Sequence, residues 1–213
     1  MEEILALVEA RLRTALGEPD ARAAVTFLGT DRIEVLRFLD GSDVVRYATL
    51  GMSAQPMADP SELLADEAGP SPDRHPSLSR FAAPQPFGPR AELVLSVRAG
   101  LADTDQVLRT LAVLAASPQV EGVVVAPGGS LDVGGPLWPE APFHSVLVGE
   151  PGGLVPDLEL DAPLEPVRFL PLLPMTPNEA AWKRVRGAAA LEERWLARGT
   201  DLRDPLRRSV ALD

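Results

Sequence analysis

The chain has 213 residues, contains no cysteine and carries a formal net charge of -11 at pH 7. A chain of this length can bury a substantial core without metal ions or cross-links. The lack of cysteine excludes disulfides, thiolate metal sites and a cysteine nucleophile. The negative charge disfavours nucleic acid and anionic membranes as partners and favours a basic protein, although an acidic surface also keeps a protein in solution.

The amino-terminal segment shows neither a secretion signal nor a membrane span. Its first residues, MEEILALVEARLR, are acidic and amphipathic, and no apolar stretch of the chain approaches the roughly 18 residues that cross a bilayer. We therefore predict a cytoplasmic protein that does not bind a membrane. We also predict that residues 1–213 form a single domain.

The first part of the chain predicts a helix followed by strands. Apolar residues at helical spacing over 2–16 indicate a helix that ends at Gly17. Three segments rich in Val, Ile, Phe and Tyr predict an antiparallel meander, namely 23–29, 32–39 and 44–50. Residues 56–89 contain eight prolines, and because proline lacks a backbone donor we expect a long loop there.

A second set of elements follows this loop. Residues 90–97 alternate with the period of two that is typical of a strand. Residues 103–118 have the start signal and the apolar stripe of a helix. Further strands are predicted at 121–126, 143–149 and 166–173, and the segment between the first two of these, 127–142, is rich in turn residues.

The carboxy-terminal part contains the sharpest local signal. Thr176, Pro177 and Glu179 have the residue types of a capping box, so a helix is predicted to start there. Gly187 predicts a break or a close packing contact within it. The order of elements lacks a regular βαβ alternation, and we predict an α+β fold with a mixed, mostly antiparallel sheet and helices packed on it.

No catalytic or cofactor motif is complete in the sequence. The two histidines, His75 and His144, lack the spacing of metal ligands. Residues 51–55 lack the last glycine of the G-x-S-x-G nucleophile motif, and the glycines at 128–135 match no phosphate-binding loop. We therefore expect no catalytic residue, no metal ion and no cofactor.

Two features have both a structural and a functional interpretation. Arg90 and Glu92 lie two residues apart on a predicted strand and so on the same face, where they form either a structural ion pair or a functional pair. Trp182 and Trp195 lie on the last helices, where buried rings would anchor the core and exposed rings would mark an interface.

Four segments follow one another in a recognisable order. They are RYATLGMSAQPM, RAELVLSV, FHSVLVGEP and a long stretch that begins with VRFLPLLPMTPNEAAWKRVRG and ends with RRSV. Together they resemble the suppressor of fused domain family in its short bacterial form, over roughly residues 20 to 210. The most specific parts are residues 49–53, Arg90 with Glu92 and Leu93, and a set of positions between Pro171 and Leu191.

This resemblance implies an α+β module that binds another polypeptide and uses no cofactor. The eukaryotic member of the family is a negative regulator in Hedgehog signalling that holds zinc-finger transcription factors, and bacterial relatives have been proposed as immunity proteins. The chain lacks the extra carboxy-terminal region of the eukaryotic protein, so the transcription-factor role is not carried over. The candidates for partner binding or family motifs are Tyr47, Thr49, Gly51, Met52, Ser53, Arg90, Glu92, Pro174, Glu179 and Trp182.

Three functions are open at this point. The first is a non-enzymatic module that binds another, basic protein, in its narrower form a bacterial immunity protein that neutralises a toxin. The alternative is a small hydrolase or small-molecule-binding enzyme with a cleft near Ser53, Glu92 and His144, which requires these groups to converge within hydrogen-bond distance. A structural subunit would instead expose an apolar patch.

Overall fold

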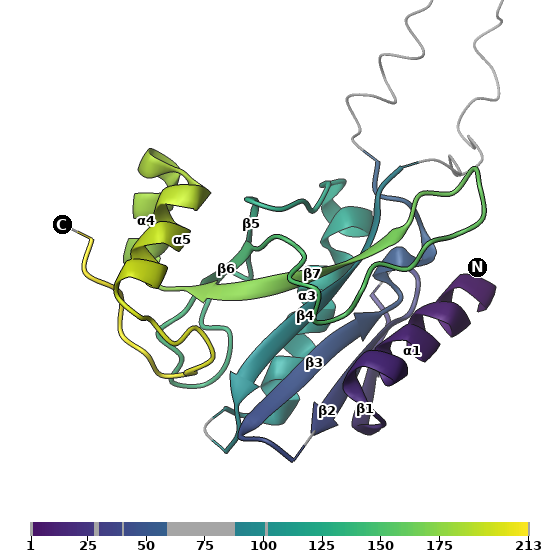
Figure 1. The fold of residues 1–213 in the computed structure, drawn as a ribbon, viewed down its shortest axis with the longest axis horizontal. Coiled ribbons are helices and arrows are strands. Elements are labelled where there is room, and N and C mark those ends of the chain that lie inside the picture. Colours follow the sequence, from purple (N-terminus) through teal and green to yellow (C-terminus); the bar gives the residue numbers. More distant parts are fainter. Residues whose placement is uncertain (1, 28–29, 40, 59–87, 101, 213) are drawn as a thin grey trace, which may run out of the picture.

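A mixed β-sheet forms the centre of the protein. A computed structural model describes residues 2–27, 30–39, 41–58, 88–100 and 102–212. In this described part the sheet has seven strands in the order β1-β2-β3-β4-β7-β6-β5 (Figure 1). The strands are β1 (Pro19–Val25), β2 (Ile33–Leu39), β3 (Val44–Leu50), β4 (Arg90–Arg98), β5 (Ser130–Asp132), β6 (Ser145–Val148) and β7 (Val167–Met175). All neighbours are antiparallel except β4 and β7, so the predicted α+β class and mostly antiparallel sheet are confirmed.

Helices cover both faces of this sheet and one of its ends. They are α1 (Glu2–Leu16), a 3-10 turn η1 (Met52–Ala54), α3 (Thr104–Glu121), α4 (Pro177–Arg186) and α5 (Ala188–Ala197). Figure 1 shows α1 in front of the sheet, α3 behind it, and α4 with α5 at the end of β6 and β7. Among the described helices, none is both long and apolar enough to cross a bilayer.

The core follows from the alternation of side chains along the strands. On β2, Ile33 and Val35 pack in the cluster that contains α3, whereas Leu36 and Phe38 pack in the cluster that contains Leu12 of α1. Neighbouring side chains on a strand point to opposite faces, so a strand buried on both faces is apolar throughout. The central strands of this sheet therefore lie between two apolar layers.

Strand β1 begins and ends earlier than predicted. It covers Pro19–Val25 rather than 23–29. Gly17 has a φ of 89°, which ends α1 and lets the chain turn directly into the sheet. Because β1 lies at the edge of the sheet, Pro19 is tolerated as its first residue although it lacks an N–H donor.

The strand predicted at 121–126 is wrong, because α3 continues past Pro118 to Glu121. Gly122 adopts the left-handed conformation, with a φ of 67°, and donates its N–H to the carbonyl of Pro118, which closes the last helical turn. The segment that follows stays outside the ladder of the sheet. Conversely, the short strand β5 lies within the segment 127–142, which is rich in turn residues and for which no strand is predicted.

The predicted features of the carboxy-terminal helices are confirmed. Thr176 and Glu179 form both hydrogen bonds of the capping box at the start of α4. Gly187, with a φ of 92°, separates α4 from α5. Residues 59–87, most of the predicted proline-rich loop, lie outside the described residues, but the two described ends meet where Met57 N–H donates to Pro89 O at 2.9 Å.

Replacing Leu12 tests the packing of α1 on the sheet. Leu12 is fully buried, whereas Leu7 on the same helix is 46% exposed. We expect Leu12→Ala to lower the free energy of unfolding by about 2–5 kcal/mol, because it removes buried methyl groups and leaves a cavity. Leu7→Ala should lower it by less than about 1 kcal/mol. Urea denaturation followed by circular dichroism measures both, and equal losses would contradict this placement of α1.

Candidate functional site

A buried carboxyl group links β3, β4 and the turn between them. Glu92 on β4 is fully buried. Its Oε2 accepts a hydrogen bond from Thr49 Oγ1 at 2.6 Å, and its Oε1 accepts from Ser53 Oγ at 2.6 Å, Ser53 N at 3.0 Å and Gly51 N at 2.9 Å. Thr49 Oγ1 also accepts the N–H of Leu93 at 2.8 Å. We call Thr49, Gly51, Ser53 and Glu92 the Glu92 network.

The turn in this network requires glycine. Gly51 has a φ of 136°, which a residue with a side chain rarely adopts. A Cβ atom at this position would lie 2.5 Å from the carbonyl oxygen of Arg32. Both the backbone angle and the close approach of the chain before β2 therefore favour glycine, and they direct the N–H groups of Gly51 and Ser53 towards Glu92.

Arg90 holds the same turn from its carbonyl side. Its Nη1 donates to Ser53 O at 2.7 Å and to Ala54 O at 3.0 Å. Within the described residues no ion pair joins Arg90 to Glu92, so the interpretation of these two residues as a structural ion pair is wrong. The two side chains lie on one face of β4, as predicted, but one binds the donors of the turn and the other binds its acceptors.

Burial sets the protonation behaviour of Glu92. Loss of solvent raises the pKa of Glu92 above its ordinary value, while hydrogen bonds from Ser53, Thr49 and the backbone N–H groups of Gly51 and Ser53 act in the opposite direction. Ser53 is also fully buried, so its hydroxyl faces no space that a substrate could enter. The arrangement stabilises a turn and presents no accessible nucleophile.

His144 does not join Ser53 and Glu92. Its side chain is exposed, and its backbone N–H donates to the carbonyl of Met175. On β7 the neighbour of Glu92 is Phe169, whereas the neighbour of His144 is Met175. These two positions are six residues apart, which is roughly 20 Å along an extended strand. The cleft that the hydrolase alternative requires is therefore not assembled from these three residues, and His75 lies outside the described residues.

A second buried carboxyl group organises the carboxy-terminal end. Glu179, the third residue of α4, is fully buried. Its Oε1 accepts from Trp195 Nε1 at 3.0 Å and from Val210 N at 3.0 Å, and its Oε2 accepts from Thr176 N at 2.9 Å. One side chain therefore connects the start of α4, a ring on α5 and the last segment of the chain.

Arg207 supplies the countercharge that the sequence did not reveal. Its Nη1 lies 2.7 Å from Glu179 Oε1, and its Nη2 donates to Glu179 Oε2 at 3.0 Å and to Pro174 O at 2.7 Å. The guanidinium also packs over the rings of Phe143 and Trp195, at 4.9 and 5.4 Å from their centroids. Burial alone would raise the pKa of Glu179, but the hydrogen bonds from Arg207 and the other donors lower it below its ordinary value.

The ten candidate residues divide by exposure. Trp182 is partly exposed on α4, and the other nine are buried: Tyr47, Thr49, Gly51, Met52, Ser53, Arg90, Glu92, Pro174 and Glu179. A buried side chain shapes a surface without touching a partner, so among these ten only Trp182 is placed for direct contact. Their role in partner binding stays a prediction.

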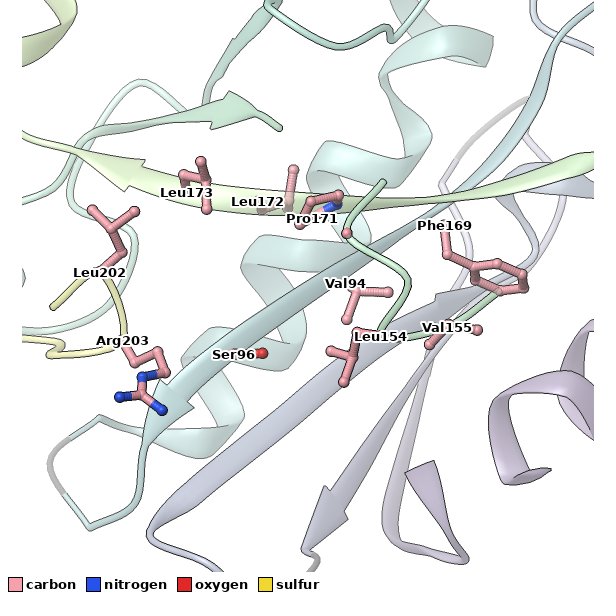
Figure 2. A pocket seen from close by; sticks show the side chains of 11 residues that line it. Val94, Ser96, Leu154, Val155, Phe169, Pro171, Leu172, Leu173, Leu202 and Arg203 are labelled. Carbon is pink, nitrogen blue, oxygen red and sulfur yellow. The ribbon is translucent and has the colours of Figure 1, made fainter. Parts of the chain in front are cut away.

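An apolar pocket lies where two neighbouring strands separate. β7 pairs with β4 as far as Pro171 and then pairs with β6. Figure 2 shows Val94 and Ser96 from β4, Leu173 from β7 and Leu154 from the preceding loop around the resulting space, with Leu202 and Arg203 at one end. Its volume is about 110 Å³. No sequence pattern predicts this pocket, because it depends on the change of pairing partner along β7, which is a tertiary feature.

In the described ranges, no group of three or more His, Asp or Glu side chains is placed to hold a metal ion.

Comparisons with known proteins identify relatives in sequence and in fold. A family model described as "Suppressor of fused protein (SUFU)" matches residues 29–208. A comparison with curated proteins gives no match. A protein from Neisseria gonorrhoeae described as a suppressor of fused homologue superposes with a TM-score of 0.68 at 17% identity, over 99% of this chain and 98% of that one.

Two further solved structures have the same fold. A chain of the Sufu–Fu complex matches with a TM-score of 0.58 at 11% identity, over 98% of this chain and 91% of that one. Drosophila Suppressor of Fused matches with a TM-score of 0.55 at 11% identity, over 97% of this chain but 50% of that one. At these identities the likeness concerns the fold alone.

Glu92→Gln tests the raised pKa through the dependence of stability on pH. Between the pKa of an unfolded glutamate and the higher folded value, the folded state holds a proton that the unfolded state has released, so the free energy of unfolding falls as pH rises. Glutamine does not titrate. We therefore expect the stability of the wild type relative to Glu92→Gln to decrease as pH rises above about 4.5.

Urea denaturation across the acid to neutral range measures this difference. Glu18→Gln, at a glutamate whose side chain is 78% exposed, controls for the loss of one negative charge. If the free energy of unfolding of wild type, relative to that of Glu92→Gln, stays constant or increases with pH, the raised pKa is contradicted.

Removing Arg207 should leave Glu179 buried without its countercharge. The side chains of Arg207 and Glu179 are 5% and 0% exposed, and breaking such a pair typically lowers the free energy of unfolding by about 3–5 kcal/mol. We expect this loss for Arg207→Ala in urea denaturation. Arg203→Ala, at an arginine that is 51% exposed and pairs with Asp201, should cost at most about 1 kcal/mol. Similar losses for the two variants would refute the structural role of Arg207.

Proposed function

Because the chain belongs to the suppressor of fused protein (SUFU) family, we propose that it acts by binding another polypeptide through its exterior. The observation that carries this proposal is the likeness in fold to a chain of the Sufu–Fu complex, which is described as bound to a second protein. The proposal assigns no chemical reaction to the chain.

The buried networks support this proposal. The polar groups of Glu92, Ser53 and Thr49 bind one another inside the sheet, and Glu179 with Arg207 does the same at the helical end. Each group has partners within the fold, as buried polar groups require. These groups therefore act by fixing the shape of the surface, which is what a binding module needs.

The charge of the chain supports a partner that is basic over at least part of its surface. Residues 1–176 carry 12 Lys or Arg against 25 Asp or Glu. Such an imbalance attracts a positively charged protein and accelerates its association at low salt. We propose that this encounter takes place in the cytoplasm and that residues 1–213 act as one domain.

A narrower form of the proposal is a bacterial immunity protein that neutralises a toxin. This hypothesis rests on the resemblance of the sequence alone. It predicts that the partner is harmful when it is produced by itself and harmless when the chain is produced with it. A partner that is harmless by itself would remove the immunity role and leave the binding function.

Affinity capture followed by reconstitution tests the binding function. The full chain is the bait, and the captured protein is then purified and titrated into the chain by calorimetry. We expect a stoichiometric complex whose affinity falls as the NaCl concentration is raised, because salt screens charge complementarity between surfaces. The absence of any protein that binds stoichiometrically would contradict the function, and an affinity that is indifferent to salt would contradict the basic partner.

A further inference from the structure

The carboxy-terminal end of the chain has the opposite charge to the remainder. Residues 177–213 contain eight Lys or Arg and six Asp or Glu, in contrast to the strongly acidic residues 1–176. Glu179 and Arg207 are both buried and neutralise each other, which leaves seven Lys or Arg and five Asp or Glu in this segment. The end of the molecule formed by α4 and α5 (Figure 1) is therefore locally positive on a negative protein.

A depression lies on this positive end. It has a volume of about 540 Å³ and is lined by Trp182, Val185, Arg186 and Arg194, with Leu212 from the last segment of the chain. Val185 is 81% exposed. Among the described residues that line it there is no acid. We call these five residues the Trp182 surface.

Trp182 arranges the charges of this surface. The guanidinium carbons of Arg186 and Arg194 each lie 5.8 Å from the centroid of its ring, so the ring holds two cations beside an apolar patch. Tryptophan and arginine are also the residues that contribute most often to binding energy in protein interfaces. Burial is the main cause that lowers the pKa of the neighbouring Lys183, and the charge of Arg184 adds to it.

We propose that the Trp182 surface binds an acidic segment of a partner protein. An apolar side chain of that segment packs against Trp182 and Val185, and a carboxylate of the segment lies on Arg186. This inference rests on the proposed function, because it names the place and the chemistry of the contact. The acidic remainder of the chain repels a long phosphate backbone more strongly than a short segment with few carboxylates, and the apolar Val185 and Leu212 suit an apolar side chain, which favours a peptide over a nucleic acid. The partner is then acidic where it meets this surface and basic where it meets the acidic remainder.

Selection of peptides tests the proposal without knowledge of the natural partner. Random peptides displayed on phage are selected on the immobilised full chain at about 50 mM NaCl, where charge contacts are weakly screened. We expect the selected peptides to be enriched in Asp and Glu together with Leu, Phe or Trp. The best peptide, labelled with fluorescein, is then titrated with the chain and its variants by fluorescence anisotropy.

Three variants locate the binding site of this peptide. Arg186→Glu and Val185→Asp should each weaken its binding by about tenfold or more, because each places a negative charge against an acidic segment. Arg109→Glu, at an exposed arginine on α3, should change it by less than about twofold. Circular dichroism and urea denaturation confirm that the variants fold, which their exposed positions favour.

Several outcomes would overturn the proposal. The selected peptides would show no enrichment in Asp and Glu, or Arg186→Glu would bind the best peptide as tightly as the wild type does. An oligonucleotide would bind with the same dependence on Arg186, or the chain would form a dimer that Arg186→Glu dissociates. A captured partner that binds wild type and Arg186→Glu equally would overturn this inference and leave the proposed function intact. The absence of any stoichiometric partner would contradict the proposed function itself.

Discussion

The carboxyl group of Glu92 holds the centre of the sheet together. It lies away from water and accepts hydrogen bonds from Thr49 at the end of β3 and from Gly51 and Ser53 in the turn. A buried carboxyl group is tolerated only when such donors surround it. The turn must therefore take the shape that Gly51 permits. The hydrogen bonds of Glu92 also fix the position of β4 relative to this turn, and β7 pairs with β4.

Glu179 is a second buried carboxyl group surrounded by donors, at the carboxy-terminal end of the molecule, but one of its donors is a cation. Glu92 is surrounded by neutral donors, so burial dominates and its pKa is raised. Glu179 is paired with the cation of Arg207, so its pKa is lowered. A buried acid thus stabilises the sheet, and a buried ion pair stabilises the terminal helices.

Local signals in the sequence predicted the elements that depend on neighbours in the chain. The capping box at Thr176 and the break at Gly187 are of this kind, because the required residues lie within a turn of one another. The sequence places the end of α3 too early, because a proline usually stops a helix. Here the helix continues through Pro118, and Ser117 Oγ donates at 2.7 Å to the carbonyl of Leu114, which the proline cannot bind. The family resemblance places Glu92 among the candidate residues. Its hydrogen bonds to Thr49 and Ser53, like the pair of Glu179 with Arg207, join residues that are distant in sequence, so no local pattern predicts them.

The parallel pairing of β4 with β7 also constrains how the protein acquires its structure. Strands β1, β2 and β3 pair with neighbours in the chain, whereas Arg90 at the start of β4 meets Val167 only after α3, β5 and β6 have intervened. Contacts between such distant segments form slowly, because a long loop must be closed first. During synthesis the amino-terminal meander can assemble early, but the sheet is completed only once β7 has left the ribosome.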